Sequence, residues 1–256
     1  MTKKVETFEH LMESFRYQFD VQTAFDDFLT IALCAVTRDA NTGLSVYEDL
    51  YLETIAKYKD SELRFKFPDL FGVLITEMDN RAGSGNDVLG EYFERNVTRG
   101  RGGQYFTPWP VCKLMTSCVV GDQPESSPVL RILDPACGSG RMLLAGSETH
   151  GKQHYYYGID IDQMCVKMAI LNLFLNGVFH AEVMCADALK AGDFRISYRT
   201  SFLPLGIFRI TEKEQSQLWH RYQSYARERT TPVAPDLSLP SEDGDSTIQG
   251  TQLNLF

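Results

Sequence analysis

The chain has 256 residues, of which 43% are hydrophobic and 23% charged, and its formal net charge is −9. This composition is typical of a globular protein with a sizeable core, and the excess of acid argues against tight, unaided binding to duplex DNA, which depends on Lys and Arg. The chain has no apolar run that could span a membrane, no apolar signal sequence after Met1 and no C-x-x-C pair among its six cysteines, so we expect a cytoplasmic protein without a zinc site.

Residues 1–100 are predicted to form a helical N-terminal region. Apolar side chains recur there at spacings of three and four, as on one face of a helix: Phe8, Leu11, Met12, Phe15 and Phe19. Further helices are predicted over residues 21–36, 46–57 and 68–79, with breaks at 41–43 and 83–86. Asn86 or Asp87 suits the N-cap of a helix that begins at Val88.

Residues 101–229 change to alternating strands and helices. Short apolar runs over residues 130–133, 155–159 and 181–185 are separated by helical patterns over 142–149 and 164–176. This alternation predicts an α/β domain with a parallel sheet covered by helices. Asp134, Asp160 and Asp187 follow the three strands directly, at the edge where open α/β sheets bind ligands.

Residues 230–256 are rich in Pro, Ser, Gly and acidic residues. Such a composition buries little apolar surface, so the sequence predicts a disordered acidic tail. The tail ends in Gln252-Leu253-Asn254-Leu255-Phe256, an apolar pentapeptide.

The most informative segment is Asp134-Pro135-Ala136-Cys137-Gly138-Ser139-Gly140. It predicts a strand end that turns tightly into a helix. Its glycines allow unusual backbone angles and close approach to a ligand, and the N-terminus of the following helix favours an anionic group such as a carboxylate.

This string resembles the S-adenosylmethionine (SAM) motif of the N6-adenine DNA methylases, in particular the methylation subunits of type I restriction-modification systems. The segments 87–93, 103–108 and 157–162 resemble the family's flanking segments in the same order. The resemblance implies a class I SAM-dependent methyltransferase fold, with a Rossmann-like sheet, and SAM as the cofactor.

The resemblance also implies roles for particular residues. Asp134, Ala136, Gly138 and Gly140 would line the methionine end of SAM, Asp160 would accept hydrogen bonds from the ribose hydroxyls, Asp187 would meet the adenine amino group, and Tyr105, Phe106 and Thr107 would contact the cofactor from the other side. Asp187 is equally compatible with a turn, and Asp162 suits a helix N-cap better than a ligand.

Two features depart from the family. Its catalytic tetrapeptide, Asn/Asp-Pro-Pro-Tyr/Phe, is not found, so the catalytic residues stay unknown. At the expected position the chain reads Phe202-Leu203-Pro204-Leu205, a degraded motif in which Phe202 would replace the Asn and Leu205 the aromatic residue. Few residues remain for a seven-stranded sheet, so we expect the sheet to be incomplete at its C-terminal end.

The terminal pentapeptide resembles the peptide by which bacterial replication and repair proteins bind the DNA polymerase sliding clamp. Gln252, Leu253, Leu255 and Phe256 would make the contacts, and a tail that docks on its own domain is the alternative.

Three hypotheses for function follow. The first is a SAM-dependent N6-adenine DNA methyltransferase, or one subunit of a larger enzyme that binds DNA with the help of another subunit. The second is a catalytically inactive relative, tethered to the clamp, that acts in DNA replication or the maintenance of mobile elements. The third, methylation of a small molecule or protein, has little support.

Overall fold

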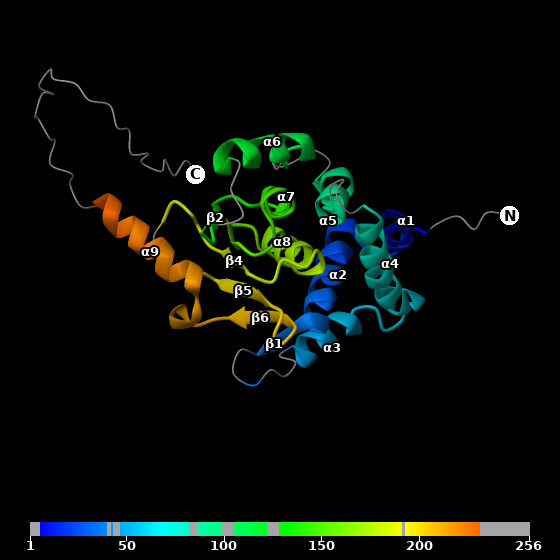
Figure 1. Ribbon diagram of the computed structural model, residues 1–256. Coiled ribbons are helices and arrows are strands. Elements are labelled where there is room, and N and C mark those ends of the chain that lie inside the picture. The colour runs from blue at the N-terminus through cyan, green and yellow to red at the C-terminus, as the bar shows by residue number, and fades with distance from the viewer. Residues whose placement is uncertain are drawn as a thin grey trace, which may run out of the picture.

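A six-stranded sheet with helices on both faces forms the centre of the molecule (Figure 1). The computed structural model describes residues 6–39, 42, 47–81, 86–98, 105–121, 128–190 and 193–230. The strands in chain order are β1 (Thr37–Asp39), β2 (Arg131–Asp134), β3 (Tyr155–Asp160), β4 (Ala181–Cys185), β5 (Ile196–Ser201) and β6 (Gly206–Ile210).

The order of strands across the sheet is β1-β6-β5-β4-β3-β2. Strands β2, β3 and β4 are parallel, with Leu133 opposite Tyr157 and Tyr157 opposite Glu182. Strand β5 is antiparallel to both β4 and β6, and β1 is parallel to β6. The carboxyl ends of β2, β3 and β4 therefore lie at one edge of the sheet, which we call the carboxyl edge.

Helices from both halves of the chain cover the sheet. Those of the N-terminal half are α1 (Phe8–Glu13), η1 (Ser14–Tyr17), α2 (Val21–Val36), α3 (Glu48–Ala56), η2 (Glu62–Phe65), α4 (Lys66–Asn80), α5 (Val88–Tyr92) and the π-helical turn η3 (Phe93–Thr98). The helices that follow along the chain are α6 (Trp109–Val120), α7 (Arg141–His150), α8 (Gln163–Leu175), η4 (Lys213–Gln215) and α9 (Gln217–Thr230).

Helix α8 lies between the sheet and the N-terminal helices. Nine consecutive residues of α8, from Cys165 to Leu173, are buried, because the helix packs on β3, β4 and β5 on one side and on α2 on the other. A helix that is apolar all round is stable only in such an enclosed position. One continuous core therefore runs from Phe8 in α1 to Ile207 in β6.

The opposite face of the sheet carries a smaller core. Tyr157, Ile159 and Met184 pack there against Leu218 of α9. Figure 1 shows α9 on the side of the sheet away from α2 and α8.

The predicted α/β fold is confirmed, and the three predicted strands, β2, β3 and β4, are parallel, but the sheet as a whole is mixed because β5 is antiparallel to β4 and β6. The elements expected from the sequence over residues 142–149, 164–176 and 181–185 are present within one residue. The N-terminal region is mainly helical, and it also contributes one short strand, β1, which pairs with β6. The division of the chain at residues 100 and 230 stays a prediction.

Candidate cofactor site at the carboxyl edge

The glycine-rich turn joins the end of β2 to the start of α7, as the sequence predicts. Gly138 has φ +53°, and a Cβ atom at this position would lie 2.6 Å from the nearest ring carbon of Phe106. Only glycine meets both the backbone angle and the close approach. The turn ends at Gly140, which precedes the first residue of α7, and Ala136 is exposed at the tip of the turn.

Asp134 and Asp160 flank this turn from neighbouring strands. The Asp134 carboxylate accepts a hydrogen bond from the Ala136 amide at 3.0 Å, and Asp160 accepts from the amides of Gly138 at 2.8 Å and Asp162 at 2.9 Å. Burial raises the pKa of both carboxyls, and the neighbouring Asp160 raises that of Asp134 further. Two half-buried carboxylates therefore face the place where a cationic or hydroxyl-bearing ligand would enter.

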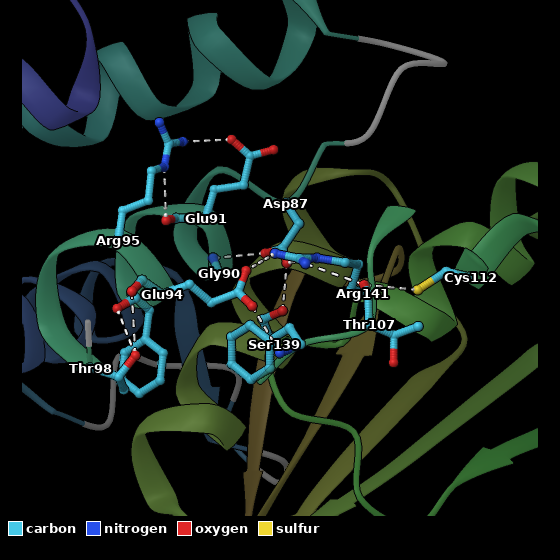
Figure 2. Close-up of polar contacts among 12 residues, drawn as sticks. Asp87, Gly90, Glu91, Glu94, Arg95, Thr98, Thr107, Cys112, Ser139 and Arg141 are labelled. Atoms are coloured by element: carbon cyan, nitrogen blue, oxygen red, sulfur yellow. Dashed lines mark hydrogen bonds and ion pairs between the residues drawn. The ribbon is translucent and has the colours of Figure 1, made fainter. Parts of the chain in front are cut away.

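A buried polar network centred on Asp87 fixes the turn (Figure 2). The Asp87 carboxylate, 2% exposed, accepts hydrogen bonds from Ser139 Oγ at 2.5 Å, Arg141 Nε at 2.7 Å and Asn172 Nδ2 at 2.7 Å. It also accepts from the Gly90 amide at 2.8 Å, as the N-cap of α5. Burial raises the pKa of Asp87, and the bonds from Arg141 and Ser139 oppose that rise. The network joins α5, the turn, α7 and α8 at one carboxylate.

Glu94 extends the network to the segment that covers the turn. Its carboxylate accepts from the Phe106 amide at 2.8 Å and from Arg141 at 2.9 Å. Arg141 donates a further hydrogen bond to the Thr107 carbonyl at 3.2 Å, and the Phe106 ring stacks on Phe93 with the ring centroids 5.6 Å apart. The Phe106 ring is thus held against Gly138.

The remaining residues singled out from the sequence are Tyr105, Thr107, Asp162 and Asp187. Thr107 is half-buried, while Tyr105 is 74% exposed beside Phe106. Asp187 accepts from the Leu189 amide at 3.0 Å and pairs with Lys190 at 2.9 Å, as a turn residue does. Asp162 accepts from the Met164 amide at 2.8 Å and caps α8, which agrees with its predicted N-cap role.

The structure contradicts the prediction of a degraded catalytic motif at residues 202–205. These residues form the turn between the antiparallel strands β5 and β6. Since β5 runs opposite to β4, the turn lies at the far edge of the sheet from Asp134 and Asp160. Phe202 and Leu203 line a hollow of about 580 Å³ there. The sequence spacing after Asp187 suggested the motif, but the antiparallel reversal at β5 carries the segment away from the carboxyl edge.

Sequence reasoning missed Glu94, Arg141 and Asn172. Arg141 is 8% exposed and Asn172 is fully buried. An Arg that is buried directly after a glycine-rich turn needs an acidic partner. Asp87 and Glu94, seven residues apart in the preceding helical segment, are the sequence signal that could have identified the partners of Arg141.

Comparison with known proteins finds a family model that matches the part of the chain that carries this site. The model of the family described as "N-6 DNA Methylase" matches residues 85–202, which include the glycine-rich turn, the Asp87 network and both carboxyl-edge acids. The match is confined to this part of the chain, and residues 85–202 are similar to the N-6 DNA methylase family. We call them the methylase segment.

The relatives are methyltransferases. The chain is 35% identical over 94 residues to the type I restriction enzyme MjaVII methylase subunit of Methanocaldococcus jannaschii, a match that covers 34% of this chain and 15% of the relative. It is 26% identical over 135 residues to the type I restriction enzyme MpnII methylase subunit of Mycoplasma pneumoniae, covering 48% of this chain and 24% of the relative. It is also 41% identical over 59 residues to the ribosomal protein L11 methyltransferase of Caldanaerobacter subterraneus, covering 23% and 18%. The chain thus spans less than a quarter of the length of each relative.

Two other predictions concern parts of the chain away from this site. The clamp-binding peptide at Gln252, Leu253, Leu255 and Phe256 lies outside the described residues. In the part of the chain that the structure describes, no helix is both long and apolar enough to cross a membrane.

Proposed function

We propose that the chain binds SAM at its carboxyl edge and supplies the cofactor-binding half of an N6-adenine DNA methyltransferase. One observation carries the proposal: the buried Asp87 network holds the Gly138 turn rigidly between Phe106 and the Asp134–Asp160 pair. The family match of residues 85–202 supports the same conclusion.

The residues at this edge suit the chemistry of SAM. The cofactor carries a positive sulfonium, a positive ammonium and two ribose hydroxyls. Asp134 and Asp160 offer two carboxylates whose mutual repulsion a cation would relieve. Each Asp160 oxygen accepts one backbone hydrogen bond and keeps lone pairs for hydroxyl donors.

When bound, SAM would supply an electrophilic methyl group. The chain's own residues would orient it. Asp160 would hold the ribose, Asp134 and the turn at Ala136, Gly138 and Gly140 would hold the methionine end, and Phe106 with Tyr105 and Thr107 would cover the cofactor. Asp187 would leave its turn contact with Lys190 to meet the adenine amino group.

Transfer to an adenine also needs groups on the substrate side. The target base must leave the stack, its amino nitrogen needs a hydrogen-bond acceptor as the N–C bond forms and the proton departs, and an aromatic ring must hold the base. The described carboxyl edge offers Asp134 and Asp160 as acceptors, but both face the proposed cofactor. We therefore infer that the chain acts on DNA together with another subunit.

A calorimetric titration with SAM tests the cofactor site. We expect binding by the wild type and binding at least about tenfold weaker in Asp160→Asn, because a hydrogen bond to a charged group is worth about 1.5–3 kcal/mol. Asp162→Ala is the matched control, since it alters a carboxylate two residues away that caps α8 and should leave the affinity unchanged. Absence of binding in the wild type, or equal affinities in all three proteins, would refute the proposal.

A further inference from the structure

The hollow at the β5–β6 turn lies where β3 and β4 begin, at the edge of the sheet opposite the carboxyl edge. We call it the amino-edge hollow. Its volume of about 580 Å³ falls within the range of about 300–1,000 Å³ that small-molecule sites occupy. The Gly138 turn lies at the other end of the strands and contributes nothing to its lining, so the hollow is separate from the proposed cofactor site.

One row of side chains across four strands forms the floor of the hollow. Tyr157 of β3 lies opposite Glu182 of β4. Glu182 in turn lies opposite Arg199 of β5, and Arg199 lies opposite Phe208 of β6. Residues opposite each other project to the same face of a sheet, and Tyr157 packs with Leu218 of α9. The hollow therefore opens on the face of the sheet that carries α9.

Aromatic rings line the end of the hollow at the β5–β6 turn. The Phe179 and Phe202 ring centroids lie 5.3 Å apart, and Phe208 belongs to the same lining. Surface turns usually consist of Gly, Pro, Asn, Asp and Ser, whereas Phe202, Leu203 and Leu205 are all exposed in this one. Exposed rings beside a cavity offer flat faces for a nucleobase, and such stacking tolerates any base.

Three arginines adjoin the hollow. Arg199 lines it. The Arg131 guanidinium lies 5.6 Å from the centroid of the Tyr155 ring, and the Arg221 guanidinium lies 6.0 Å from that of Tyr157. Among the described residues, no carboxylate lies within 4.0 Å of any of these three guanidinium groups. In a chain with a net charge of −9, a group of unpaired cations at a cavity favours an anionic ligand.

Glu182 is the acidic residue among the described side chains that line the hollow. It is 1% exposed and accepts hydrogen bonds from Ser216 Oγ at 2.5 Å, Ser197 Oγ at 3.1 Å and the Gln217 amide at 3.1 Å. These donors from β5 and the start of α9 stabilise its charge. The positions that remain open to a ligand therefore belong to the arginines and the aromatic rings.

We propose that the amino-edge hollow binds a nucleoside phosphate, with the base stacked at Phe202 and the phosphate held by Arg131, Arg199 and Arg221. Guanidinium groups bind phosphate oxygens through two parallel hydrogen bonds, and aromatic side chains stack on bases. The nucleotide is either free or one unit of a single strand, since both present the same base and phosphate. Phe208 and Arg221 lie outside the methylase segment, and the site does not depend on the proposed function.

A calorimetric titration of the full chain with thymidine monophosphate tests the site. Thymine distinguishes the probe from the adenosine of SAM, and saturating SAM should leave the affinity unchanged. We expect Arg131→Gln and Arg221→Gln each to weaken binding about tenfold, since one hydrogen bond to a charged group contributes at least that factor. Phe202→Ala should weaken binding about tenfold through loss of stacking. All three side chains are exposed, so we expect these variants to fold.

Arg64→Gln and Phe65→Ala are the matched controls. The Arg64 guanidinium lies 4.5 Å from the centroid of the Phe65 ring, and Phe65 is 59% exposed, the same fraction as Phe202. Arg64 and Phe65 belong to η2 and do not line the hollow. Both controls should bind thymidine monophosphate as tightly as the wild type does.

A second titration, with an oligothymidylate of about ten nucleotides, identifies the source of the nucleotide. An affinity at least tenfold above that of thymidine monophosphate, and weakened in the same three variants, would assign the hollow to a single strand, and any lower affinity to a free nucleotide. Absence of binding by both probes, competition by SAM, or equal losses in the hollow variants and the controls would overturn the proposal. None of these results would affect the cofactor site, which the titration with SAM tests separately.

Discussion

Asp87→Asn is the most direct test of the buried network. The substitution keeps the size of the side chain and removes the charge that Arg141 faces at 2.7 Å. The Arg141 side chain is 9% exposed, so its cation would lose its closest counter-charge without gaining water. Removal of one partner of a buried ion pair costs about 3–5 kcal/mol. We expect the lower end, about 3 kcal/mol, because Glu94 stays 2.9 Å from Arg141.

Chemical and thermal unfolding measure this loss. For a chain of this size, 3 kcal/mol corresponds to a fall in Tm of about 6–12 °C. Asp27→Asn is the control, since Asp27 is also buried, at 4% exposed, but the side chain of its partner Lys57 is 52% exposed and can regain water. We expect a loss of about 1 kcal/mol there. If Asp87→Asn were no more destabilising than Asp27→Asn, the argument from an uncompensated buried cation would be wrong.

Three further outcomes are expected at the carboxyl edge. Gly138→Ala should weaken SAM binding by about tenfold or more, equal to about 1.4 kcal/mol. Gly121→Ala should leave SAM binding unchanged, because Gly121 has a similar φ of +66° but open space around it; equal effects of the two substitutions in a titration would contradict the steric argument. Asp162→Ala should lower the free energy of unfolding by about 1 kcal/mol through loss of the α8 cap, measured by urea denaturation, and a larger loss of SAM affinity than of stability would assign it a ligand role instead. Burial raises the pKa of Asp134 and Asp160 above 3.8 in the folded protein. SAM affinity should therefore fall as the pH drops into the window just above 3.8, whereas the protein without SAM should lose stability as the pH rises through the same window, because these carboxyls bind protons more tightly in the folded state. Affinity and stability that change in the same direction with pH would refute this assignment.

Local sequence patterns were sufficient for β2, β3, β4, α7, α8 and the turn between β2 and α7, whereas α6 and β5 were not predicted. The apolar runs before Asp134 and Asp160 and the glycines after β2 specify local geometry, which needs no knowledge of the rest of the chain. The N-cap role of Asp162 followed from the same reasoning.

The long-range features were not accessible in this way. Nothing in the residues around Phe202 shows that β5 reverses direction against β4, because an antiparallel and a parallel strand have the same apolar alternation here. The four donors to Asp87 come from positions as far apart as Gly90 and Asn172. Only the folded chain shows that these groups share one buried carboxylate.

The pairing of β1 with β6 also has a consequence for folding kinetics. It joins Thr37 to Ile207, roughly 170 residues apart in the chain. Contacts of such separation carry a large loop-closure entropy and form late. We therefore expect the pairing of β1 with β6 to form late in folding, so that the outer edge of β6 stays exposed until the N-terminal segment has docked.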